Sequence, residues 1–389
     1  MRPGLVRELR LFHLYRLLAT SYFFLPTFML FQAERGLTFG ERLGLAGLYS
    51  ATIVLVEVPT GVFADRVGRR RAMIVGSVAM VVSCAVAVGA HGFGAFAVAE
   101  CLAALSMALS SGADSAYLHD LLQAHGRSAD YRRHEGIASA AHLVGSAAAA
   151  LLGGMLAAGD LALPYVATAA AAACAGLVAS RLGDARADRP PRRAGAAWAG
   201  DMVAAVAAVA RNGRLAWIVA YSTVVFILLR ATIYVYQPYL ESRGFGSVAI
   251  GATFAGTFVV GAVVALRTPA LCARLGEHRL VWGLLAMLAL SFVGLAGTGA
   301  GPWMLALLVV QAVATGMASP LTKPIMNREI ADASHRAATL SVESMARRLA
   351  MGIFAPLVGL YGEIDVMLVI GLVGLGGLAA LLLAARVYR

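Results

Sequence analysis

Long runs of apolar residues, separated mostly by short polar stretches, dominate the pattern of this 389-residue chain. A membrane-spanning helix needs about 20 mostly apolar residues. Runs of that size predict spanning helices at residues 9–32, 43–64, 72–90, 94–118, 135–158, 162–181, 215–240, 247–271, 280–299, 302–323, 337–360 and 364–386. A soluble fold is excluded, because a chain that is 60% hydrophobic and 14% charged cannot cover its surface with polar groups. The pattern predicts an all-α membrane protein with twelve transmembrane helices.

One connection, residues 182–214, is much longer and more polar than the others. It holds Pro190, Pro191 and several arginines. Its second part, Ala199 to Arg211, is rich in Ala and Val and could lie as an interfacial helix. We therefore expect an N-terminal six-helix half at 1–181, a cytoplasmic linker at 182–214 and a C-terminal six-helix half at 215–389.

The basic residues are distributed unevenly between the two predicted sides of the membrane. If both termini are cytoplasmic, 24 of the 32 Lys and Arg fall in inside segments, three in outside loops and the rest within helices. Cytoplasmic loops carry an excess of Lys and Arg, so this bias predicts cytoplasmic termini in the cell (inner) membrane. It also accounts for most of the net charge of +11 without nucleic acid as a partner.

The two predicted halves show signs of an internal repeat with an offset of 208 residues. At this offset Arg35-Gly36 falls on Arg243-Gly244, Gly68 on Gly276 and Glu135 on Glu343. The identities are few, but they concentrate at the ends of loops. Duplication, and hence two pseudo-symmetric halves, is the better interpretation.

The segment Gly61–Arg71, between the second and third predicted helices, combines one acid with four arginines. A positive-inside loop would explain the charge equally well. Its glycines would let two helix ends approach closely. The residues that carry the pattern are Gly61, Phe63, Ala64, Asp65, Arg66, Gly68, Arg69 and Arg70.

This segment resembles the loop between helices 2 and 3 of the major facilitator superfamily of secondary transporters. The twelve predicted helices in two halves and the basic linker are similar to that family as well. The resemblance covers essentially the whole chain. It implies that Gly61, Asp65, Arg66, Gly68, Arg69 and Arg70 form a latch that joins the two halves on the cytoplasmic side in the outward-facing state.

Two further family patterns are only partly present. In helix 5 of drug-exporting members, glycines recur at spacings matched here by Gly136, Gly145, Gly153 and Gly154, whereas Ala149-Ala150 replaces the family's Gly-Pro. This similarity favours export over uptake. The family's helix-4 Arg has no counterpart, because Ala108 stands at its place.

Ionisable residues within the predicted helices mark candidate functional positions, because each costs about 2.5–3.5 kcal/mol to insert. Arg16 and Glu57 lie at matching depths on consecutive helices, so they could form a pair, either structural or functional. Glu343 and Arg347 are four residues apart and share one helix face. The remaining candidates for a charge or substrate network are Glu100, Asp114, Arg230, Gln237 and Arg348.

These features predict a secondary transporter that exports a small amphiphile against protons by alternating access. No ATP-binding Gly-x4-Gly-Lys-Ser/Thr pattern occurs. Carboxylates can load and unload protons when burial and neighbouring charges change. Glu57, which precedes Val58-Pro59, is the first candidate for the proton carrier, and Asp114 is the second.

The alternatives are a proton-coupled uptake symporter for a nutrient or metabolite and, more remotely, a non-transporting receptor or a membrane-embedded transferase. The sequence shows no metal-ligand spacing and no catalytic constellation, so we expect no metal, no cofactor and no enzymatic activity. The lipid bilayer, protons and a small-molecule substrate are the expected partners, and we expect a functional monomer.

The charge bias generates a prediction about topology. In a chain whose native cysteines are replaced by serine, a cysteine introduced by Pro190→Cys should resist an impermeant thiol reagent added to intact cells. It should react after the membrane is opened. Labelling from outside would contradict the orientation.

Overall fold

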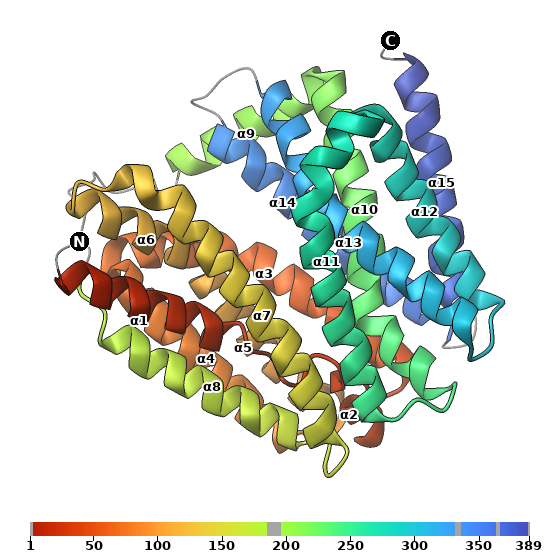
Figure 1. Ribbon diagram of the computed structural model, residues 1–389, viewed down its shortest axis with the longest axis horizontal. Helices are drawn as coiled ribbons and strands as arrows, with labels where there is room; N and C mark the ends of the chain where they lie inside the picture. Colours follow the sequence, from red (N-terminus) through yellow and green to blue (C-terminus); the bar gives the residue numbers. More distant parts are fainter. Residues whose placement is uncertain (1–2, 185–195, 331–335, 363–365, 388–389) are drawn as a thin grey trace. The chain divides into compact units, whose positions relative to one another are not determined.

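The computed structural model describes residues 3–184, 196–330, 336–362 and 366–387, and these are helical apart from their connections (Figure 1). Every predicted spanning segment contains helix. The helices of the first half are α1 (Pro3–Ala19), α2 (Phe28–Glu34), α3 (Phe39–Val67), α4 (Arg69–Val88), α5 (Gly92–Ser110), α6 (Ala113–Ala124), α7 (Tyr131–Ala157) and α8 (Leu163–Ser180). Those that follow are α9 (Ala196–Arg211), α10 (Gly213–Glu241), α11 (Ser247–Leu275), α12 (Glu277–Ala296), α13 (Pro302–Glu329), α14 (Arg336–Gly359) and α15 (Val366–Val387).

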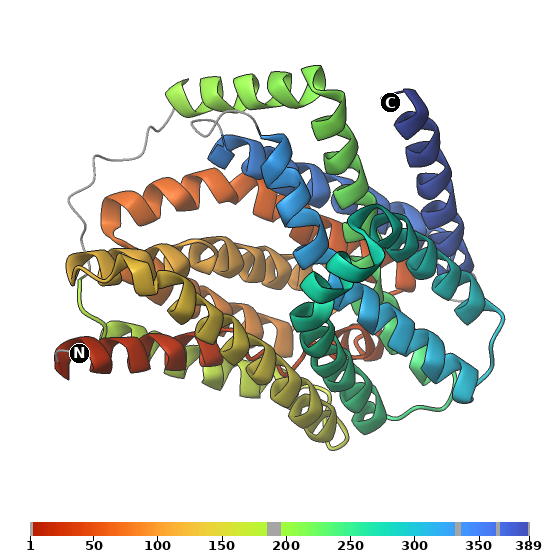
Figure 2. The ribbon, with the colours of Figure 1, turned by 45° about the horizontal axis from the view of Figure 1, so that its top comes forward.

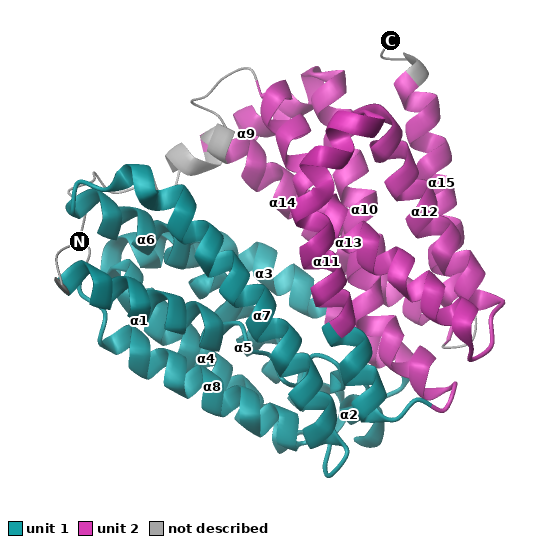
Figure 3. Cartoon of the chain, in the orientation of Figure 1, with its two compact units in different colours: residues 1–38, 48–194, 245–255 teal, residues 39–47, 195–244, 256–389 magenta. Residues whose placement is uncertain are grey.

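The chain divides into two compact units, coloured separately in Figure 3. Unit 1 comprises residues 1–38, 48–194 and 245–255, and unit 2 comprises residues 39–47, 195–244 and 256–389. The first turns of α3 are thus assigned to unit 2, and the first turns of α11 to unit 1. The boundaries expected for the two halves and the linker stay a prediction.

The two units repeat the same packing scheme. In unit 1, α1 packs on α7 and α8, and α4 packs on α5 and α8. In unit 2, α10 packs on α14 and α15, and α12 packs on α13 and α15. These are the same helix pairs after a shift of 208 residues, so the fold has two pseudo-symmetric halves, as predicted.

Two pairs of glycines strengthen this correspondence. Gly36 and Gly244 have φ of 85° and 81°, and Gly68 and Gly276 have φ of 105° and 83°. Side chains rarely adopt positive φ, so the same turn geometry requires glycine in both halves. The identities at the offset of 208 therefore have a structural cause.

The first predicted helix, residues 9–32, is interrupted. The helix α1 ends at Ala19 and α2 begins only at Phe28. Pro26 lies within the interruption, where it removes an N–H donor and disfavours helical backbone at the preceding residue. Side chains compensate at the break, where Phe23 N–H donates to Thr168 Oγ1 over 3.0 Å.

The fourth predicted helix, residues 94–118, is also divided. α5 ends at Ser110, Gly112 takes φ of 85°, and α6 begins at Ala113. Asp114 consequently lies in the first turn of a helix, where a negative charge is favourable.

The expected turn at Gly61–Arg71 is almost entirely helical, which corrects the sequence interpretation. α3 continues to Val67 and α4 starts at Arg69, so only Gly68 lies outside a helix. A Cβ on Gly61 would meet no atom within 4 Å, so this glycine does not serve a close helix approach. Pro59 is accommodated within α3, where Thr60 Oγ1 donates to the carbonyl of Val56 over 2.7 Å.

Ten helical segments in the described part of the chain are long and apolar enough to cross a membrane by length and composition alone. The two other predicted spans miss these criteria for visible reasons. The first is split into α1 and α2, and α14 carries Glu343, Arg347 and Arg348. Large apolar side chains such as Leu55, Leu266 and Trp303 are more than 70% exposed, as suits contact with lipid.

Part of the predicted linker forms a helix of its own. α9 contains the expected Ala199–Arg211 segment and packs on α10 and α14. The chain then turns sharply into α10 (Figure 2), where Asn212 Oδ1 accepts from the backbone N–H of Arg214 and Leu215 at 3.1 and 3.2 Å. Residues 185–195, including Pro190, lie outside the described part.

Helix α7 uses its glycines for close packing in unit 1. A Cβ on Gly153 would collide with the backbone carbonyl of Phe23 at the break of the first span. Ala149 and Ala150, which replace the family's Gly-Pro, are buried. Gly136, by contrast, has open space around it.

This difference predicts the cost of adding one methyl group. Gly153→Ala should destabilise the protein by about 1–3 kcal/mol, because backbone must move to admit it. The matched control Gly136→Ala, in the same helix, should be neutral or slightly stabilising, since Ala favours helix over Gly. Thermal unfolding in detergent measures both, and equal midpoints would contradict the close approach.

Candidate functional site

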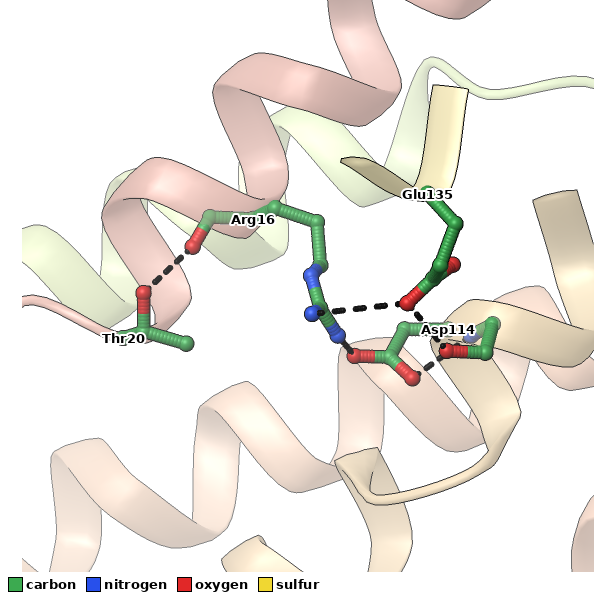
Figure 4. A network of polar contacts seen from close by, with 5 residues as sticks. Arg16, Thr20, Asp114 and Glu135 are labelled. Atoms are coloured by element: carbon green, nitrogen blue, oxygen red, sulfur yellow. Dashed lines mark hydrogen bonds and ion pairs between the residues drawn. The ribbon is translucent and has the colours of Figure 1, made fainter. Parts of the chain in front are cut away.

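One group of largely buried charges surrounds Arg16 in unit 1 (Figure 4). The Arg16 guanidinium donates to Asp114 Oδ2, and its Nη2 lies 4.0 Å from Glu135 Oε1. The three side chains are 15%, 10% and 27% exposed. The cluster thus sets one cation against two carboxylates.

Three helices position these groups. Arg16 comes from the last turn of α1, Asp114 from the first turn of α6, and Glu135 from the second turn of α7. Ser115 fixes both acids, because its N–H donates to Asp114 Oδ1 over 2.6 Å and its hydroxyl to Glu135 Oε1 over 3.0 Å. The divided fourth span therefore carries one carboxylate of the cluster at its division.

The anticipated pairing of Arg16 with Glu57 is wrong. Among the described residues, the ion pairs of Arg16 are with Asp114 and Glu135. Matching depth along two helices did not specify which face each helix turns to the other. Glu57 is half-buried on α3, and its buried Oε2 has no hydrogen-bond partner in the described part of the chain.

Two histidines lie beside the Arg16 cluster. His13 Nε2 and His134 Nδ1 are 3.3 Å apart, and the rings stack with centroids separated by 5.5 Å. His134 is next to Glu135 on α7, and His13 is one helical turn from Arg16 on α1. The described residues contain no group of three His, Cys, Asp or Glu side chains that could hold a metal ion.

A second charge cluster contains two of the predicted latch residues, Asp65 and Arg69. Arg69 Nε lies 2.8 Å from Asp120 Oδ2 on α6, and Arg69 Nη2 lies 3.5 Å from Asp65 Oδ1 on α3. Arg69 thus bridges two acids within unit 1. Arg70 Nη1 is 3.9 Å from Asp184 Oδ1 after α8, so two of the arginines have acidic neighbours.

Tyr117 extends this region toward α1. Its hydroxyl donates to Glu8 Oε2 and to the Gly183 carbonyl, both over 3.0 Å. The Gly183 N–H donates in turn to Glu8. These bonds tie the start of α1, α6 and the end of α8 together.

In unit 2 the central charged group is Glu343 on α14. Its Oε1 accepts from the Ser222 hydroxyl of α10 and lies 2.9 Å from Arg347 Nε. The expected pairing of Glu343 with Arg347 is confirmed. The Arg347 guanidinium also lies over the Phe226 ring, 5.1 Å from its centroid.

The other predicted polar candidates are distributed over both units. In unit 1, Glu100 Oε1 accepts from Gln32 Nε2 over 3.2 Å. In unit 2, Gln237 is fully buried and donates to the Ile233 carbonyl over 3.0 Å. Arg230 and Arg348 are half-buried on α10 and α14.

Several residues of these clusters were not singled out from the sequence. Asp120 and Ser115 lie near the predicted candidate Asp114, but nothing in their spacing indicates a charge network. Ser222 and Phe226 carry no signal at all. Glu135 did carry a signal in the sequence, because it coincides with Glu343 at the repeat offset. Each of these two acids contacts the first helix of its own half.

Comparison with known proteins yields one family. The family model described as Major Facilitator Superfamily matches residues 14–355 of the chain. Among curated proteins, no relative matches.

Several solved structures share the fold. A crystal structure of a mutant of the nucleoside transporter NupG aligns with a TM-score of 0.81 and 14% identity over 97% of this chain and 98% of that one. A bacterial homologue of the human lysosomal transporter Spinster, inward-facing and unoccupied, aligns with a TM-score of 0.78 and 14% identity over 99% of this chain and 98% of that one. A mutant of the peptide transporter POT in complex with sulfate aligns with a TM-score of 0.75 and 16% identity over 99% of this chain and 94% of that one. Identities this low show the fold alone.

Proposed function

This chain belongs to the Major Facilitator Superfamily, and on that basis we propose that it is a proton-coupled exporter of small amphiphilic molecules that works by alternating access. It is a membrane transporter and not an enzyme. We further propose that it resides in the cell (inner) membrane with both termini cytoplasmic, as the charge bias favours, and that it functions as a monomer.

The Arg16 cluster carries the proposal of proton coupling. An opposite charge nearby favours the ionised form of a carboxylate, and burial in apolar surroundings disfavours it. Asp114 is largely buried and bonded to Arg16, so its ionised form depends on that contact. A conformational step that separates Arg16 from Asp114 would let the acid take up a proton, and the reverse step would expel it.

This assignment places Asp114 ahead of Glu57 as the proton carrier. Glu57 has an unpaired buried oxygen but no arginine beside it among the described residues. Glu135 shares the Arg16 guanidinium and is the site to which the cation could shift. Glu57 remains the second candidate.

Export is supported by helix α7. The glycines at 145, 153 and 154 match those of drug-exporting members, and each lies against another backbone or side chain at close range. Small residues allow helices to pack closely and slide. Uptake of a nutrient by a symporter is the alternative.

We also propose that the cluster of Asp65, Arg69 and Asp120 forms the latch. The contact of Arg69 with both acids holds α3, α4 and α6 together, so the charged surface that a latch needs is preformed within unit 1. Gly61, Arg66, Gly68 and Arg70 complete it.

The latch has a conformational test. With the native cysteines replaced by serine, spin labels at Gln123→Cys and Asn327→Cys report the distance between the two halves. Asp65→Asn should raise the share of molecules with the longer, cytoplasm-open distance by about fivefold or more, as expected for loss of about 1 kcal/mol of coupling. The control Asp130→Asn should leave the distances unchanged. Unchanged distances in Asp65→Asn would contradict the proposed latch.

The coupling proposal predicts that Asp114→Asn separates transport from the proton gradient. In proteoliposomes, uptake of a ligand identified by thermal-shift screening should fall at least tenfold when driven by a pH gradient. Exchange of labelled for unlabelled ligand should stay within about threefold, because substrate binding needs no proton step.

Two variants control this experiment. Glu34→Gln alters an exposed acid at the end of α2 and should behave as the unmodified protein. Glu57→Gln tests the second candidate in parallel. Full gradient-driven transport by stable Asp114→Asn protein, with its loss in Glu57→Gln, would transfer the role to Glu57.

A further inference from the structure

Arg347 in unit 2 is surrounded by an acid, a hydroxyl-bearing side chain and an aromatic ring. Two residues one helical turn apart on α10, Ser222 and Phe226, face two residues one turn apart on α14, Glu343 and Arg347. Residues at this spacing share one helix face. The four side chains therefore form one layered contact between two packed helices.

Each partner in this contact restrains a different part of the Arg347 side chain. Glu343 lies 2.9 Å from Nε, on one edge of the guanidinium. Phe226 covers a face of the guanidinium. Ser222 holds Glu343 by donating to the same oxygen, Oε1, that approaches Nε. In the described part of the chain Nε has no hydrogen-bond partner, so the ion pair with Glu343 and the contact with Phe226 are what restrain the guanidinium.

The opposite edge of the guanidinium is available. Within the described residues, neither Nη1 nor Nη2 of Arg347 donates a hydrogen bond to protein, and the side chain is 30% exposed. A planar guanidinium edge with two donors matches the two oxygens of a carboxylate.

The depth of Arg347 in the membrane favours a transported substrate over a lipid headgroup as its ligand. It lies eleven residues after the start of α14, or about 17 Å at 1.5 Å per residue. The middle of a bilayer core lies about 15 Å from either face, where headgroups do not reach. Ligands of membrane carriers bind at this depth.

Packed apolar side chains continue from Arg347 along the same pair of helices, where Met351, Ala355 and Val235 are buried. A small cavity begins one turn further on, lined by Met351, Phe354 and Ala355 of α14 and by Ala231 and Val235 of α10. A ligand with its charged group at Arg347 would find apolar contacts in this direction.

We propose that Arg347 binds the carboxylate of an amphiphilic organic anion, which defines the substrate class of the transporter. This inference rests on the proposed function for its role in transport, but the binding site itself does not. Glu343 and Phe226 act as positioning residues, and the apolar body of the ligand lies toward Met351.

The test uses a matched series of ligands on the purified full-length protein. Phenylbutyrate, octanoate and naphthoate are compared with their primary amides and with the corresponding amines, by thermal shift and equilibrium binding. The carboxylates should bind about 10- to 100-fold more tightly than the amides, as expected for charge-assisted hydrogen bonds.

The variants assign this preference to Arg347. Arg347→Gln should abolish it, and Arg347→Lys should keep part of it, since lysine retains the charge but lacks the two-donor edge. If Arg347→Gln fails to fold because Glu343 loses its partner, Glu343→Gln with Arg347→Gln removes both charges. Arg328→Gln, which breaks another Arg–Glu pair of unit 2, should keep the preference.

Three outcomes overturn the inference: carboxylates that bind no more tightly than amides, an Arg347→Gln protein that retains the preference, or no binding by any carboxylate. Flux measurements distinguish these from failure of the proposed function. If carboxylates bind through Arg347 but no gradient-driven flux is measured, the proposal of coupled transport is contradicted and the inference about Arg347 stands. Gradient-driven flux of amines without a carboxylate preference would remove this inference alone.

Discussion

The cost of placing charge in an apolar environment governs the polar structure of this transporter. Each charged side chain at the centre of a spanning helix costs about 2.5–3.5 kcal/mol to insert. Two groups of described charges follow from this cost, Arg16 against Asp114 and Glu135 in unit 1 and Arg347 against Glu343 in unit 2. Breaking such a group leaves a buried charge without compensation, so a change in one contact must be matched by another, or by a proton.

The fold places these groups where they can respond to helix movement. Asp114 begins α6 just after the break at Gly112, and Arg16 lies just before the break that Pro26 imposes on the first span. The glycine at 153 brings α7, which carries Glu135, against that same break. A shift of α1, α6 or α7 would therefore alter the Arg16 contacts directly. In unit 2, both members of the ion pair lie on one helix, so the pair moves as a body.

Much of the fold could be predicted from the sequence, because spanning helices require long apolar runs and each run is visible. The repeat was visible as well, since Gly68 and Gly276 are required by the same positive φ in both halves. The breaks were missed, although Pro26 and Gly112 mark them, because apolar character continues through both. The contacts were harder to predict. Depth along a helix can be counted, but the face that each helix turns inward cannot, and this is why Arg16 was paired with Glu57 and not with Asp114. The pair of Glu343 and Arg347 succeeded because both residues share one helix.

The central claim is that Asp114 gains and loses a proton under the control of Arg16. Infrared difference spectroscopy of the purified transporter, recorded as the pH is lowered, detects the carbonyl stretch of protonated carboxyl groups directly. We predict a band that is absent in Asp114→Asn and that develops at higher pH in Arg16→Gln, where the stabilising cation is gone. A spectrum in which Asp114→Asn removes no carboxyl band would contradict the account.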